Sequence, residues 1–202
     1  GVVGLGAPGA AAAGNAPLRA QADMDGLLAS LASAATGSAV DAVVMSLLPL
    51  MATRPKQRLL RLITHVTTLR SGLMDRIPFY MRLLATFSRV APWVGEETAR
   101  IVMDEFRRLS RTAPGSSLSR RVDLKLRNIR LISELVKFRV CAPAAAFTAW
   151  SALLTSPTLH NMHMLCALLE HCGSWLYCCS DTHSSMRAFM DSSARHIASG
   201  AI

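Results

Sequence analysis

The stretch from Leu124 to Val140 constrains the fold more than any other part of this sequence. Its apolar residues recur every three or four positions, which is the spacing of one helix face, and five of its residues are Lys or Arg. We expect one long amphipathic helix that is both a core element and a basic surface. A helix with these two properties fits a binding scaffold better than an enzyme.

Helical periodicity also dominates the rest of the chain, and no segment shows the alternation of a strand. We expect helices over Met24–Ala35, Val40–Met51, Lys56–Leu69, Asp75–Val90, Glu96–Arg111, Leu124–Val140, Pro143–Leu154, Ser156–Tyr177 and Asp181–Ile197. The short turns between them predict an all-α fold, an α-α superhelix of stacked antiparallel helix pairs of the HEAT or armadillo type. Because no repeat identity is visible, the pattern alone leaves open a compact, irregular helical domain.

Three local features give finer predictions. Pro92 and Gly95 mark a turn before the helix that starts at Glu96. Gly173 lies inside a helix, where its cost of about 1 kcal/mol indicates close contact with another helix. The apolar face of the helix over residues 156–177 is predicted to contain Leu159, Met162, Cys166 and Leu169.

The composition indicates a single, largely buried helical domain. Hydrophobic residues make up 51% of the chain and charged residues 17%. We expect a flexible Gly/Ala/Pro-rich linker over residues 1–22 and one helical domain over residues 23–198. Because the sequence begins at Gly1 instead of Met, we expect a piece of a larger protein. No stretch reads as a membrane span, and five Cys indicate reduced thiols in the cytosol or nucleus.

The net charge of +9 favours polyanions or acidic protein partners, and the excess is local. The segment from Arg107 to Arg139 has ten basic residues against two acidic ones. The candidate RNA- or partner-binding residues are Arg107, Arg108, Arg111, Arg120, Arg121, Lys125, Arg127, Arg130, Lys137 and Arg139. Without an accompanying run of aromatic residues, base-specific RNA recognition is not expected.

Two interpretations of these cations remain open. In the first, they form a solvated face in which Glu134, as a structural residue, pairs with Arg130 and Lys137. In the second, the remaining cations contact phosphates or an acidic partner; these are chiefly Arg120, Arg121, Lys125, Arg127 and Arg139.

Other reactive residues do not form a recognisable site. His160, His163 and Cys166 lie one turn apart, but the paired Cys-x-x-Cys or His-Glu-x-x-His spacing of a zinc site is missing. We therefore predict no metal, no cofactor and no catalytic residue. Glu170 lies in a very apolar helix, so we expect it to be buried as a structural polar tie to a neighbouring helix.

Three segments resemble a known family. They are residues 76–90 (RIPFYMRLLATFSRV), the end of the basic helix at Glu134-Leu135-x-Lys137-Phe138-Arg139, and residues 168–176 (LLEHCGSWL). In this order they resemble the middle domain of translation initiation factor four-G, in the version found in scaffolds of nonsense-mediated mRNA decay. Those scaffolds carry three tandem copies, and this chain is most similar to the second. The resemblance covers roughly residues 54–191.

The resemblance implies a HEAT-like scaffold without catalysis, in the cytoplasm or near the nucleus. Its implied partners are other surveillance proteins (up-frameshift factors), neighbouring domains of the same chain and mRNA. Related middle domains serve translation initiation, cap binding or ribosome assembly, and these are the alternative; a metal or thiol enzyme is a more distant one. Ser174 replaces an Arg of the family pattern, and Tyr177-Cys178-Cys179 replaces a basic residue, so RNA contact is not carried over to that end.

Overall fold

The computed structural model describes residues 24–34, 36–51, 55–69, 71–111 and 118–198. Within these residues the regular secondary structure is helical, and turns or short irregular segments join the helices. Residues 24–33 form a helix, followed by α2 (Gly37–Met51), α3 (Pro55–Thr67), η1 (Ser71–Arg76), α4 (Ile77–Val90), α5 (Pro92–Arg111), α6 (Leu118–Lys137), α7 (Ala144–Thr155), α8 (Leu159–Leu168), η2 (Leu169–Gly173), α9 (Ser174–Cys178) and α10 (Ser180–Ala198). The predicted linker lies outside the described residues.

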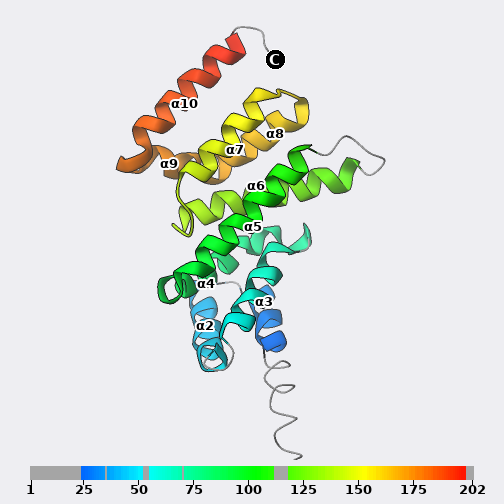
Figure 1. The fold of residues 1–202 in the computed structure, drawn as a ribbon, viewed down its shortest axis with the longest axis vertical. Helices are drawn as coiled ribbons and strands as arrows, with labels where there is room; N and C mark the ends of the chain where they lie inside the picture. The colour runs from blue at the N-terminus through cyan, green and yellow to red at the C-terminus, as the bar shows by residue number, and fades with distance from the viewer. Residues whose placement is uncertain (1–23, 35, 52–54, 70, 112–117, 199–202) are drawn as a thin grey trace, which may run out of the picture.

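The helices form an elongated stack that runs from α2 and α3 at one end to α10 at the other (Figure 1). Successive even-numbered helices contact one another, α2 with α4, α4 with α6 and α6 with α8, while α3 contacts α5 beside them. Sequential contacts such as α4 with α5 and α7 with α8 join the layers. The predicted all-α stack of helix pairs is confirmed.

Helix α6 occupies the centre of the stack, where it contacts α4, α5, α7 and α8. Burial on several sides explains why polar residues of this helix are as hidden as its apolar ones. Asn128, Ser133 and Glu134 are each fully buried beside Ile132 and Val136. The Asn128 amide donates to the Val102 carbonyl at 2.9 Å, which ties α6 to α5.

The end of α6 differs from the prediction, because the helix stops at Lys137 and turns back. Arg139 has a φ of 56°, which is the left-handed region. Its N–H donates to the Val136 carbonyl at 3.0 Å, and the Val140 N–H donates to the Leu135 carbonyl at 2.9 Å. These two bonds form a Schellman motif, which satisfies the last carbonyls of the helix.

Helix α5 also departs from the prediction, since Pro92 and Gly95 do not mark a turn. The helix starts at Pro92, which suits a first helical position because proline has no N–H to leave unpaired. Gly95 lies inside α5, where a methyl group would come within 3.1 Å of the Val140 carbonyl oxygen. A glycine is therefore needed to let α5 approach the turn that follows α6.

The helix predicted over residues 156–177 is interrupted and buries a different face. Residues Leu169–Gly173 form a π-helix between α8 and α9. The predicted apolar face is wrong at Leu159, which is 86% exposed, and at Cys166, which is exposed, whereas Met162 and Leu169 are partly buried against the core. The buried residues are instead Met164, Leu165, Ala167, Leu168, Cys172 and Leu176.

Candidate functional site

The ten candidate cations fall into groups with different surroundings, and the first group is internal. Arg127 is only 9% exposed. Its guanidinium donates to Glu105 Oε1 of α5 at 2.9 Å and to the Leu69 carbonyl oxygen at 3.0 Å. Arg127 therefore joins α6 to α5 and to the residues after α3.

The buried carboxylate of Glu134 pairs with two more of the candidate cations, Arg130 and Lys137. Its Oε1 lies 2.8 Å from Lys137 Nζ and 3.1 Å from Arg130 Nε, and the side chain is fully buried. The predicted pairing of Glu134 with both cations is confirmed. The separate Arg127–Glu105 pair and these residues together make up what we call the internal ion-pair network.

The Arg130 guanidinium also contacts His171 Nδ1 of the π-helix η2. Burial, and then the charge of Arg130, lower the pKa of His171 below its usual value. A neutral imidazole at this position accepts the arginine N–H, so the contact extends the network from α6 to η2.

Arg107 and Arg108 are exposed, and each has a carboxylate within one helical turn. Arg107 Nη1 lies 2.7 Å from Asp104, and Arg108 Nη2 lies 3.5 Å from Glu105. Arg139 projects from the turn after α6 and is exposed. Arg120 belongs to α6, and its side chain lies outside the part of the structure that is described.

The last group lines a groove of about 730 Å³ where α5 ends, α6 begins, and α7 meets α8. Arg111, Arg121 and Lys125 contribute its charge, and Leu153 and Leu159 contribute apolar surface. We call these five residues the cationic groove. The described residues that line it include no Asp or Glu.

The two α6 cations of the groove affect each other. Partial burial, and then the positive charge of Arg121, lower the pKa of Lys125 below its usual value. Taking a cation out of water beside a like charge is unfavourable unless an anion is near. The groove is thus electrostatically suited to a negatively charged ligand.

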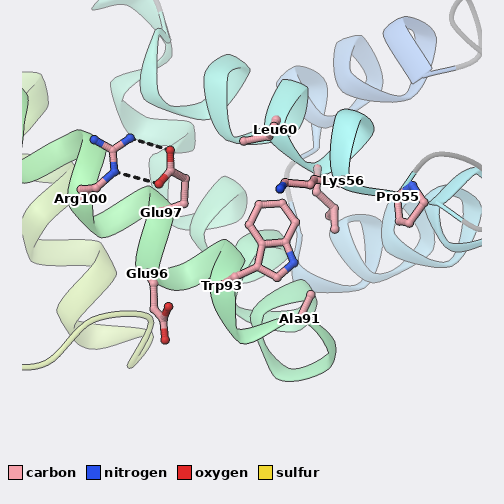
Figure 2. Close-up of a pocket in the computed structure, with 9 residues that line it drawn as sticks. Pro55, Lys56, Leu60, Ala91, Trp93, Glu96, Glu97 and Arg100 are labelled. Carbon is pink, nitrogen blue, oxygen red and sulfur yellow. Dashed lines mark hydrogen bonds and ion pairs between the residues drawn. The ribbon is translucent and has the colours of Figure 1, made fainter.

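A second groove, of about 870 Å³, lies between α3 and α5. Figure 2 shows the Trp93 indole at its centre, with Lys56 above the ring and Glu96 on the other side. Here both signs of charge are present, and Arg100 donates to Glu97 at 2.6 and 2.8 Å. This groove lacks the single-signed charge of the cationic groove.

The two remaining structural predictions concern Glu170 and Gly173. Glu170 is exposed, so the prediction of a buried polar tie is wrong. It continues the exposed face of α8, since His163 and Cys166, seven and four residues before it, are exposed as well. Gly173 is buried and faces Met186 of α10, but a methyl group there would make ordinary contacts of 3.4 to 3.8 Å with Leu169 and Met186. The close contact inferred for Gly173 is instead found at Gly95.

The thiols and imidazoles do not converge in the described part of the chain. No group of three or more His, Cys, Asp or Glu in those residues is placed to hold a metal ion. Burial raises the pKa of Cys172 to about 11 and that of Cys141 to about 12, which keeps both thiols protonated near neutral pH. Among the described helices, none is both long enough and apolar enough to cross a bilayer.

The layered stack and its surface grooves define a HEAT-like α-helical domain. Residues 21–199 match the MIF4G domain, and the chain belongs to the MIF4G domain family. This confirms the resemblance to the middle domain of initiation factor four-G.

Relatives of this chain come from plants, animals and fungi. It is 30% identical over 118 residues to Regulator of nonsense transcripts UPF2 of Arabidopsis thaliana, covering 58% of this chain and 10% of that protein. It is 27% identical over 161 residues to Regulator of nonsense transcripts 2 of Homo sapiens, covering 79% and 12%. Nonsense-mediated mRNA decay protein 2 of Schizosaccharomyces pombe is 25% identical over 131 residues, covering 65% and 12%. The chain thus spans 10–12% of the length of these relatives.

Proposed function

We propose that this chain is a non-catalytic scaffold domain of a cytoplasmic mRNA-surveillance factor. It presents fixed surfaces to other surveillance proteins and to neighbouring domains of the same polypeptide. The observation that carries the proposal is the similarity to relatives named for nonsense transcripts or nonsense-mediated decay. The internal ion-pair network supports it, because buried charges held across α5, α6 and η2 favour one rigid arrangement of the outer surface.

Deletion of residues 21–199 from the full-length protein tests the scaffold function. We expect the half-life of a reporter mRNA with a premature stop codon to lengthen, while the same mRNA without that codon is unaffected. An unchanged half-life of the nonsense reporter, with the truncated protein at normal abundance, would contradict the proposal.

A second candidate function is contact with the RNA backbone. The observation that favours it is the gathering of Arg111, Arg121 and Lys125 around one groove. Because phosphate contacts release counterions, such binding weakens steeply as salt is raised. Titration of this chain with single-stranded RNA at about 50 and 200 mM salt tests the idea, and no binding at the lower salt would exclude it.

A further inference from the structure

The cationic groove combines positive charge with an exposed apolar side chain. Arg111, Arg121 and Lys125 supply positive charge, and no Asp or Glu is among the described residues that line it. Leu159, the first residue of α8, lies on the same groove and is 86% exposed. Leu153 of α7 lines it as a buried residue.

The position of Leu159 is fixed by the start of α8. Thr158 caps this helix, and its hydroxyl accepts the Asn161 N–H at 3.2 Å. Capping anchors the first turn, so Leu159 is held beside the cations. An exposed leucine that is held in place gains free energy only when another apolar group covers it.

These two features distinguish between the anions that can enter the groove. A nucleic-acid backbone satisfies the cations through its phosphates, but bases stack chiefly on aromatic side chains, and no Phe, Tyr or Trp is among the described residues that line the groove. An acidic protein segment with an apolar side chain between its carboxylates satisfies both. The cations of α5 and those of α6 beyond Lys125 do not extend the groove into a long basic track, because Arg107, Arg127 and Lys137 pair with carboxylates.

We propose that the cationic groove binds an acidic segment of a protein partner, with a leucine or aromatic side chain of that segment covering Leu159. This rests on the scaffold function proposed above and names the chemistry of one partner. The carboxylates of the segment lie against Lys125, Arg121 and Arg111, and the apolar side chain lies between Leu159 and Leu153.

Fluorescence anisotropy with a labelled peptide tests the proposal on the chain as it is. The probe is a peptide of 12 residues that alternates Asp and Glu with Leu and Phe. One control peptide has Asn and Gln in place of the acids, and another has Ser in place of Leu and Phe. A uridine 12-mer of RNA is the third probe. We expect only the acidic, apolar peptide to bind well.

Each variant of the groove has a matched control variant elsewhere on the surface. We expect Lys125→Glu to weaken binding about tenfold or more, and Leu159→Ser to weaken it about tenfold. The matched controls on α10, Arg187→Glu and Met190→Ser, replace an exposed cation and an exposed apolar residue, and they change affinity less than about twofold. Circular dichroism is used to check that each variant is folded.

Three results would overturn the proposal. The first is tighter binding of the uridine 12-mer than of the peptide, with Leu159→Ser having no effect, which assigns the groove to nucleic acid. The second is equal binding of the acidic and the amide peptides. The third is no peptide binding at low salt. Each leaves the scaffold function to the reporter experiment, because deletion of residues 21–199 removes every surface of the domain and tests that function whichever ligand fills this groove.

Discussion

Lys125 and Arg127 lie two residues apart in α6, yet their surroundings are opposite. Lys125 lines an open groove beside another cation, and its ammonium is destabilised there. Arg127 is 9% exposed and bound to a carboxylate and a carbonyl oxygen. Helical geometry explains the difference, since residues two apart point roughly 200° away from each other around the axis.

The same contrast separates the two halves of α6. Its first half contributes Arg121 and Lys125 to the cationic groove, whereas its second half contributes Arg130, Glu134 and Lys137 to the internal network. The number of basic residues in this segment therefore overstates the positive charge at its surface, because some of them are buried and paired. Substitutions in the network are expected to change stability, and substitutions in the groove are expected to change binding.

The largest expected effect is at Glu134. Glu134→Gln keeps the size of the side chain but leaves Arg130 and Lys137 half-buried without their anion, so we expect a loss of about 3 kcal/mol in the free energy of unfolding. Urea denaturation followed by circular dichroism measures it. Adding Lys137→Met to this variant removes one stranded cation and recovers part of the loss. A loss below about 1 kcal/mol would mean that the network behaves like a surface ion pair.

Arg127→Met is expected to cost about 2 kcal/mol, because Glu105 loses its closest cation and the Leu69 carbonyl loses its donor. Lys125→Met is the matched control, with the same change of side chain two residues away. We expect it to shift the free energy of unfolding by less than about 0.5 kcal/mol. Equal losses in the two variants would break the distinction between network and groove.

A smaller loss of stability is expected at Gly95 of α5, which packs against the turn that follows α6. In Gly95→Ala, the new methyl group would lie 3.1 Å from the Val140 carbonyl oxygen and 3.3 Å from Ser88 Cβ. We expect a loss of about 1 kcal/mol, because this crowding exceeds the gain in helix propensity. Gly173→Ala makes only ordinary contacts, so thermal unfolding should show it as neutral or slightly stabilised. If Gly173→Ala is destabilised, the close helix contact predicted at Gly173 from the sequence would be supported after all.

The smallest effect is a dependence on pH at His171. The pKa of His171 lies below the usual 6.5 because burial and Arg130 both disfavour the imidazolium. As pH falls below about 6.5 the unfolded chain takes up the proton first, so the folded state loses stability. We expect the free energy of unfolding to fall less between about pH 7.5 and 5.5 in His171→Gln than in the wild type. An unchanged slope in His171→Gln would show that this imidazole is not the cause.

The helical fold could be predicted from the sequence because it depends on local periodicity. The helix predicted over residues 56–69 has Leu59, Leu62, Ile63 and Val66 on one face, and all four are buried in the structure. The three motif segments were also enough to indicate the family, which the match over residues 21–199 confirms. Which of the tandem copies this chain resembles most stays a prediction.

The division of the candidate cations could be predicted only in part. The pairing of Glu134 with Arg130 and Lys137 follows from spacing along one helix. The burial of Arg127 does not, because it depends on Glu105 in another helix and on the backbone near Leu69. The role of Gly95 was missed for the same reason, since the Val140 carbonyl that approaches it belongs to a turn in a different part of the chain.

The groove itself was missed because its apolar part contradicts the expected pattern. Periodicity placed Leu159 on a buried face, and the structure exposes it. The available signal was the Thr158 cap, which makes Leu159 the first residue of a helix.

The π-helix over Leu169–Gly173 also affects how this chain is compared with others. A π turn holds one more residue than the α turn it replaces, while the helix continues in nearly the same direction. A homologue with an uninterrupted α-helix here would be one residue shorter and still present the equivalent of Leu176 to the core. Alignments that forbid a single-residue gap in this helix would then pair buried positions with exposed ones over the whole C-terminal segment.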